Sequence, residues 1–230
     1  MDADQLLLGL VAYIVLLLSL TVHEAAHAWT ALRGGDQTAY LGGQVSLDPR
    51  PHIRREPFGM VVLPLISLVG GSMFGYASAP IDPRWAYVHP KRAAVVAAAG
   101  PLANLALALI GGSALRLGVA VGWFVPVPVS SYELAVVPGG GVGESVVLVL
   151  SVLFSMNLLL FVFNLMPVPP LDGSSAIGLL LSESSARRLQ EWMARPMLAL
   201  GGILLAYLLM RRIVGPVLWA AVDLLYLGAG

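Results

Sequence analysis

Long apolar runs separated by short polar stretches dominate the sequence. A transmembrane helix needs about 20 mainly apolar residues, and four segments meet that length: 5–32, 92–117, 144–165 and 193–212. Two other apolar segments are ambiguous. Residues 58–75 are short and interrupted by a proline and paired glycines, while 213–228 form either a last short crossing or an extension of the helix before them. The pattern predicts an all-α polytopic membrane protein with about five to six membrane segments.

The polar connection after the first helix, residues 36–56, contains a stretch with the composition of a β-strand. This stretch, Thr38 to Leu47, is interrupted by Gly42 and Gly43, and it predicts a small β-ribbon. The sequence shows neither an internal repeat nor a soluble domain. Residues 1–230 are therefore expected to form a single membrane-embedded domain, with its core at 5–182 and C-terminal helices within 185–228.

Composition agrees with a membrane protein. Of the 230 residues, 58% are hydrophobic and only 11% are charged, whereas a soluble domain carries about 25% charged residues. The formal net charge is zero, so no nucleic-acid partner is expected. Cysteine is absent, so any metal would be held by His, Asp or Glu. No Lys or Arg precedes the first apolar run, which favours a retained transmembrane helix over a cleaved signal peptide.

Lys and Arg mark the cytoplasmic side of a membrane protein. They follow the first helix and precede the second and fourth, whereas the first residues and the loop 119–143 contain none. We therefore expect a multi-pass protein of the inner or plasma membrane with its N-terminus outside and its first and third helices running inward. Segment 58–75 has basic residues on both sides, which favours a re-entrant segment shielded by protein. The pair Arg211–Arg212 fits poorly, because the fourth helix would carry it outside.

The sequence HEAAH, residues 23–27, places three ionisable side chains near the end of the first helix. His23 and His27 lie about 40° apart on one helix face, so both can bind one metal ion. Glu24 points about 100° away from His23, where it can reach a metal-bound water as a general base. A chance match is the alternative, but ionisable residues in transmembrane helices usually serve a function. The motif therefore predicts a metal site.

A catalytic zinc site commonly has three protein ligands. The candidate for the third is Asp172 in NLMPVPPLDG, residues 164–173, where prolines end the third helix. Because the first and third helices both run inward, Asp172 and HEAAH fall at similar depth, on the cytoplasmic side and roughly 9–15 Å below the surface. The alternative is that Asp172 and Gly173 form only a turn.

Three asparagines in the later helices are candidates for polar groups around such a site. Asn164 and Asn104 could each hydrogen-bond a substrate carbonyl or an oxyanion. Packing between helices is the alternative for all three, and it is the preferred interpretation for Asn157.

HEAAH and NLMPVPPLDG, in this order and in membrane helices, resemble the site-2 protease family of intramembrane zinc metalloproteases. The similarity continues through GGQVSLDPRPHIRREPFGMVVLPL and AAAGPLANLALAL, and it weakens after about residue 185. These segments are similar to the compact branch of the family, which lacks PDZ and CBS domains.

The resemblance implies one zinc ion held by His23, His27 and Asp172, with Glu24 as the catalytic base and Asn164 near the substrate. It also implies an enzyme of the lipid bilayer that cleaves transmembrane helices of membrane-protein substrates. We expect the ribbon around Tyr40–Leu47 to pair with an unwound substrate strand. The alternatives are a catalytically inactive homologue that binds membrane clients and an ion-coupled transporter.

Overall fold

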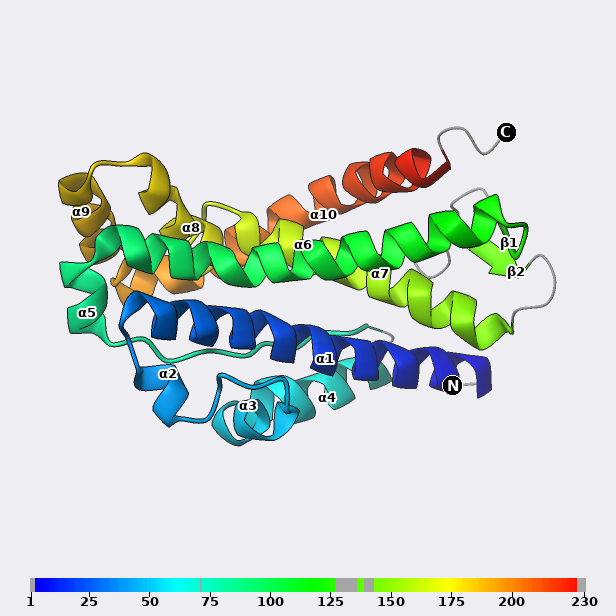
Figure 1. The fold of residues 1–230 in the computed structure, drawn as a ribbon, viewed down its shortest axis with the longest axis horizontal. Helices are drawn as coiled ribbons and strands as arrows, with labels where there is room; N and C mark the ends of the chain where they lie inside the picture. Colours follow the sequence, from blue (N-terminus) through cyan, green and yellow to red (C-terminus); the bar gives the residue numbers. More distant parts are fainter. Residues whose placement is uncertain (1–2, 71, 127–135, 139–142, 227–230) are drawn as a thin grey trace.

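Four long helices form the body of the structure (Figure 1). They are α1 (Ala3–Gly34), α6 (Pro90–Ala120), α7 (Glu144–Leu165) and α10 (Pro196–Tyr226). The computed structural model describes residues 3–70, 72–126, 136–138 and 143–226. Within that part of the chain, these four helices are the ones long and apolar enough to cross a membrane by length and composition. They correspond to the four long segments predicted from the sequence.

Short elements connect the long helices. After α1 the chain forms α2 (Thr38–Leu41), α3 (Pro49–Arg55), the π-helix η1 (Phe58–Val62), α4 (Leu63–Val69) and α5 (Pro83–Val88). Between α6 and α7, strand β1 (Phe124–Pro126) pairs antiparallel with β2 (Val136–Pro138), Val125 opposite Val137. After α7 come α8 (Asp172–Ala176), the 3-10 helix η2 (Ile177–Leu180) and α9 (Glu183–Met193).

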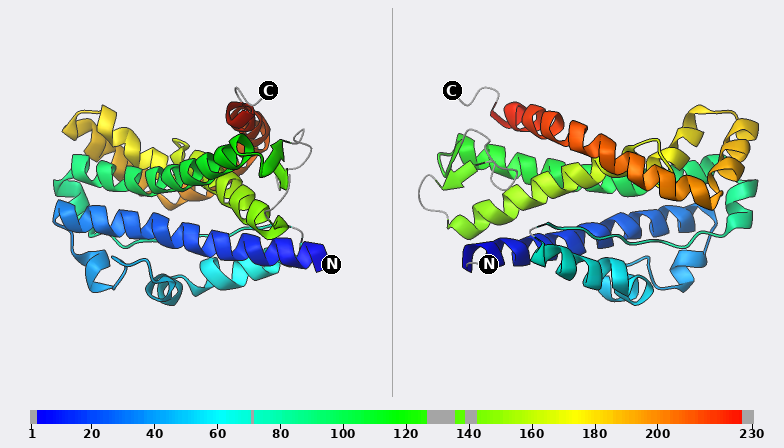
Figure 2. Two further views of the ribbon diagram at one scale, coloured as in Figure 1. Left: turned by 45° about the vertical axis from the view of Figure 1, so that its right-hand side comes forward. Right: turned by 180° about the vertical axis from the view of Figure 1, so that it is seen from behind.

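The elements stack in layers that both views of Figure 2 preserve. Helices α2–α4 cover one side of α1, while α6 and α7 pack on its other side and α10 lies beyond them. Many buried positions of α6 recur every three or four residues and are mostly small: Ala93, Ala97, Gly100, Asn104, Ala108, Gly111 and Leu115. Small side chains let helix backbones approach closely, so this face explains how α6 can lie between α1 and α7.

The β-ribbon predicted at Thr38–Leu47 is wrong, because residues 36–56, all of them described, contain helices and turns and no strand. The Asp36 carboxylate accepts the N–H and the hydroxyl of Thr38, which starts the helical turn α2. Asp48 caps α3 by accepting the N–H of Arg50. Local capping therefore outweighs the strand-like composition. The expected pairing of this ribbon with a substrate strand loses its structural basis.

The segment 58–75, predicted to be re-entrant, forms η1 and α4 beside α1. A Cβ added to Gly9 of α1 would lie 2.2 Å from Cδ1 of Leu68, so α4 approaches α1 closely. Residues 72–82 then return to α5 as an extended connection (Figure 1). The chain thus leaves and returns at the same end of the bundle, as expected for a re-entrant segment, which stays a prediction.

The carboxylate of Asp36 links the chain just after α1 to the start of α5. Oδ1 of Asp36 accepts from Thr38, and its Oδ2 accepts the N–H of Asp82 at 2.9 Å. Burial by itself raises the pKa of Asp36, but the hydrogen bonds from Thr38 and Asp82 outweigh it, so the pKa is lowered from its ordinary value. The charged form of Asp36 therefore fixes α5, and with it the start of α6, beside the end of α1.

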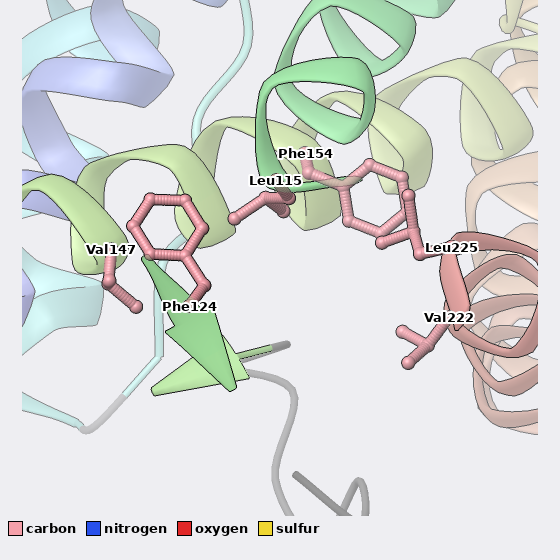
Figure 3. Close-up of a cluster of buried hydrophobic side chains, with 6 residues drawn as sticks. All are labelled: Leu115, Phe124, Val147, Phe154, Val222 and Leu225. Atoms are coloured by element: carbon pink, nitrogen blue, oxygen red, sulfur yellow. The ribbon is translucent and has the colours of Figure 1, made fainter. Parts of the chain in front are cut away.

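Large apolar side chains gather at the end of the bundle away from α8 and α9 (Figure 3). The cluster consists of Leu115, Phe124, Val147, Phe154, Val222 and Leu225. A Cβ added to Gly118 would lie 2.1 Å from Cδ2 of Phe124, so a side chain there would displace the aromatic ring. The cluster joins β1 and α10 to α6 and α7.

Helix α10 is continuous through Pro216, so the described part of 213–228 extends the preceding helix and is not a separate crossing. Arg211 and Arg212 are exposed near the middle of this helix. The sequence analysis placed this pair at the end of the fourth segment, 193–212. The structure corrects that placement, because the helix continues well past both arginines.

The turn between α7 and α8 presents Asp172 and packs against α10. Prolines end α7 here because they lack an N–H and clash with a continuing helix. The apolar residues among and beside them, Met166, Val168 and Leu171, are buried against Ala206 of α10. Gly202, one helical turn before Ala206 on α10, lies in close contact with the backbone of this turn. A Cβ added to Gly202 would lie 1.6 Å from the carbonyl oxygen of Pro169. Helix α10 therefore sets the position of the turn.

Substitution of this glycine should displace the turn. We expect Gly202→Val to lower the free energy of unfolding by about 1–3 kcal/mol, because the added atoms overlap the backbone of the turn. Thermal or chemical unfolding in detergent measures the change. Gly201→Val is the matched control, since nothing lies within 4 Å of a Cβ at Gly201. Equal stability of the two variants would contradict the close contact.

Candidate metal centre

Residues of α1 and α8 converge on one point inside the bundle. Nε2 of His23 lies 3.0 Å from Nε2 of His27 and 3.0 Å from Oδ2 of Asp172. Nε2 of His27 lies 3.4 Å from the same oxygen. Within the described part of the chain, these residues form a group of three potential metal ligands with mutually close ligand atoms. The structure thus brings together the three side chains that the sequence predicted as ligands.

Helix α1 positions the histidine pair. The four-residue spacing stacks the two rings edge to face, with centroids 4.6 Å apart and an angle of 79° between the ring planes. Each ring is also held through Nδ1. For His27 the partner is the carbonyl oxygen of Val96 at 2.7 Å, and for His23 it is Oδ1 of Asn104 at 2.5 Å. Both partners belong to α6, so packing of α6 on α1 orients the pair.

The donor set fits a cation. A carbonyl oxygen only accepts, so Nδ1 of His27 donates to Val96, and in the neutral ring Nε2 keeps a lone pair. That lone pair and the Asp172 carboxylate point at the same volume, where they would repel each other without a positive charge between them. In a tetrahedral zinc site with bond lengths of about 2.0–2.1 Å, ligand atoms are separated by about 3.3 Å. The observed separations of 3.0–3.4 Å suit two nitrogens and one oxygen around one zinc ion.

Gly100 of α6 faces the ligand atoms directly, and the sequence analysis did not single it out. A Cβ added to Gly100 would lie 2.3 Å from Nε2 of His27 and 2.5 Å from Nε2 of His23. Any side chain would therefore enter the volume that both nitrogens face. The sequence signal that could have identified Gly100 is the Gly-Pro pair inside a helical segment. Glycine inside a helix costs about 1 kcal/mol relative to alanine, so its presence there indicates another role.

Glu24 lies beside the ligands without joining them. It is buried, with 4% of its surface exposed. It is within electrostatic range of both histidines and of Asp172, but it is not part of the group whose ligand atoms converge. This is the placement expected for a base that exchanges protons beside a metal ion.

The three asparagines occupy two different environments. Asn104 and Asn157 are fully buried and bonded to each other, with Nδ2 of Asn104 donating to Oδ1 of Asn157 at 2.9 Å. Both ends of the Asn104 amide thus contact protein groups, whereas the sequence-based hypothesis had this residue contacting substrate. Asn164 lies in the last turn of α7, is half-buried and makes no side-chain hydrogen bond to another described residue.

The fold and the converging side chains define a multi-pass helical membrane protein with a buried His–His–Asp centre suited to zinc. The chain belongs to Peptidase family M50, the site-2 protease family, whose family model matches residues 11–209. It is a zinc-dependent metalloprotease of the membrane. The resemblance, the enzyme class and the zinc cofactor expected from the sequence are thereby confirmed.

Three similar proteins have related names. "Putative zinc metalloprotease YwhC" of Bacillus subtilis (strain 168) is 37% identical over 170 residues, which are 72% of this chain and 68% of that protein. "Putative zinc metalloprotease Rip2" of Mycobacterium tuberculosis H37Rv is 32% identical over 161 residues, covering 70% of this chain and 53% of the relative. The protein of the same name from Mycolicibacterium smegmatis is 31% identical over 180 residues, covering 76% and 60%. The chain thus spans about half to two thirds of each relative's length. No solved structure matches it significantly.

Proposed function

We propose that this protein is an intramembrane protease that hydrolyses peptide bonds in or near transmembrane helices of other membrane proteins. In this proposal His23, His27 and Asp172 hold one zinc ion and Glu24 is the general base. The observation that supports it best is the convergence of three ligand atoms from two distant parts of the chain within a bundle of membrane-length helices. A centre at this depth suits a substrate that lies in the bilayer.

The depth of the centre follows from the length of α1. His27 precedes the end of α1 at Gly34 by seven residues, or about 10 Å along a helix. We propose that this end faces the cytoplasm and that the N-terminus lies outside, in the inner or plasma membrane. The support is the excess of Lys and Arg in the segments that follow α1 and precede α6.

Zinc bound at this centre supplies a Lewis acid for a peptide carbonyl and lowers the pKa of water. The chain's own residues supply the rest of the chemistry. The Glu24 carboxylate takes a proton from the attacking water and later gives it to the leaving amide nitrogen. The Asn164 side chain, half-buried and without a described protein partner, donates its N–H to the substrate backbone.

A helical peptide bond is shielded by its own hydrogen bonds, so the substrate unwinds locally before it is cut. Unwound backbone at membrane depth needs polar partners, because lipid offers none. We propose that the amide of Asn164, in the last turn of α7, and the carboxylate of Glu24 provide such partners. A substrate with a weak helix at the appropriate depth is therefore the class of protein that this site suits.

Metal removal and loss of the third ligand test the proposal together. We expect the full-length chain, reconstituted in vesicles, to bind one zinc ion and to cut a single-span model substrate within its apolar segment. Chelation should abolish cleavage and added Zn²⁺ should restore it. Asp172→Ala should lose zinc and cleavage, because two imidazoles alone leave the ion without its anionic ligand. Metal analysis and mass spectrometry of the fragments provide the measurements.

Two outcomes would refute this assignment. Zinc binding and cleavage at wild-type levels in Asp172→Ala would exclude Asp172 as a ligand. Cuts mapped only to the extramembrane part of the model substrate would exclude intramembrane cleavage. Asp223→Ala is the matched control, since Asp223 is an exposed carboxylate of α10 and lies outside the converging group.

A further inference from the structure

We propose that Asn104, held in place by Asn157 and Ser19, sets the tautomer and ring orientation with which His23 binds the metal ion. Asn104 is then a positioning residue of the metal centre and does not bind substrate. This inference rests on the proposed function, because it takes His23 to be a zinc ligand.

The orientation of the two amides follows from backbone carbonyls, which can only accept hydrogen bonds. Nδ2 of Asn157 donates to the carbonyl oxygen of Leu153 and to Oγ of Ser19, both at 2.9 Å. Oδ1 of Asn157 therefore faces Asn104, whose Nδ2 donates to it at 2.9 Å and to the carbonyl oxygen of Ser19 at 3.4 Å. The remaining amide atom, Oδ1 of Asn104, faces Nδ1 of His23 at 2.5 Å. Turning the Asn104 amide over would place its oxygen against two acceptors.

This order of bonds determines which nitrogen of His23 carries the hydrogen. An amide oxygen only accepts, so Nδ1 of His23 donates to Asn104, and in the neutral ring that can bind a metal ion Nε2 keeps its lone pair. Nε2 is the atom that lies 3.0 Å from Oδ2 of Asp172. The Val96 carbonyl imposes the same tautomer on His27. Both imidazoles are thus preset as Nε2 ligands, one by a backbone carbonyl and the other by a side chain.

The network is buried and joins three helices. Ser19 lies on α1, one turn before His23, while Asn104 lies on α6 and Asn157 on α7, and all three have no exposed surface. Hydrogen bonds between membrane helices contribute little to stability on average. In contrast, loss of a partner behind a metal-bound histidine commonly lowers metal affinity about 10–100-fold. Orientation of His23 therefore explains this polar network better than stability does.

The test measures metal binding apart from catalysis. The full-length chain in detergent is stripped of metal and titrated with Zn²⁺ against a chromophoric chelator, and it is loaded with Co²⁺ for absorption spectra. We expect Asn104→Leu to raise the zinc Kd about 10–100-fold and to shift the Co²⁺ d–d bands, because the His23 ring is free to turn. Asn104→Asp keeps an oxygen acceptor for Nδ1, but its second oxygen faces the acceptor oxygens of Asn157 and Ser19, so this variant should raise the zinc Kd less than Asn104→Leu does.

Further variants separate positioning from packing. Asn157→Leu should raise the zinc Kd less than Asn104→Leu, because Asn104 keeps the longer bond to the Ser19 carbonyl. Ser155→Ala is the control, since it removes from α7 a half-buried hydroxyl that donates to the Ser151 carbonyl of the same helix. This variant should leave the zinc Kd and the Co²⁺ spectrum unchanged.

A normal zinc Kd and Co²⁺ spectrum in Asn104→Leu, combined with a fall in cleavage alone, would overturn the proposal and assign Asn104 to substrate. If Asn104→Leu does not fold, Asn157→Leu decides, and wild-type values for both measurements there would overturn it. Failure of the proposed function has a different signature. The proposed function would fail if Asp172→Ala bound zinc normally, and that result does not depend on Asn104.

Discussion

Glu24→Gln is expected to abolish cleavage of a transmembrane substrate while one zinc ion stays bound. Glutamine has nearly the same shape as glutamate, but its neutral amide cannot take a proton from water. General-base catalysis contributes about 10²–10⁴-fold to a rate, and the loss should fall in that range. Zinc should remain because Glu24 is not among the converging ligand atoms. Fragment analysis gives the rate, and metal analysis of the same sample gives the zinc content.

Glu183→Gln is the matched control for this substitution. Glu183 lies on α9 in an exposed ion pair with Arg187, far from HEAAH in the sequence, so its conversion to an amide should change neither cleavage nor zinc content. More than a tenth of wild-type activity in Glu24→Gln would remove Glu24 from the role of base. Loss of zinc in that variant would instead make Glu24 a ligand.

Gly100→Ala is expected to weaken zinc binding strongly while the protein still folds. The added methyl would lie 2.3 Å from Nε2 of His27 and 2.5 Å from Nε2 of His23. Both atoms are ends of side chains, so the rings can turn away and the helices need not move. Zinc affinity should fall on the order of 100-fold, the upper end of what a misplaced histidine costs. A chelator competition measures this loss, and cleavage should fall with it.

The stability of Gly100→Ala should not fall along with its zinc affinity. Alanine is favoured over glycine inside a helix by about 1 kcal/mol, so the zinc-free form should unfold at the wild-type temperature or above it. Gly112→Ala is the control on the same helix, where a Cβ would meet the Phe154 ring at 3.1 Å. That variant should keep wild-type zinc affinity. Normal zinc binding in Gly100→Ala would show that Gly100 does not face the ion.

The long helices could be predicted because their signals are local. A continuous apolar run of membrane length indicates a helix whatever surrounds it, and all four long predictions have a matching helix. The prediction of a ribbon at Thr38–Leu47 failed for the opposite reason. Composition favours a strand there, but Asp36 and Asp48 bond to backbone N–H groups and start helical turns. Propensity is a weak guide wherever a few capping groups decide the backbone.

The candidate site was accessible from the sequence only in part. The pair His23 and His27 follows from helical periodicity, and Asp172 follows from matched depth at the ends of two helices. Helical periodicity does not reveal that Asn104 contacts His23, because this contact depends on how α6 is rotated against α1. Gly100 carries no functional group at all. Its importance becomes visible only from the space that a side chain would take.

By itself, the sequence determined the membrane helices, the shared face of His23 and His27 and the end of α7 before Asp172, because each depends on residues within a few turns of one another. Only the tertiary structure decided that Asp172 meets a histidine 149 positions away, that Asn104 turns its oxygen to that histidine, and that α6 leaves the centre open at Gly100. These features depend on the depth, rotation and separation of packed helices. Packing between helices sets those quantities, and no single stretch of the chain contains them.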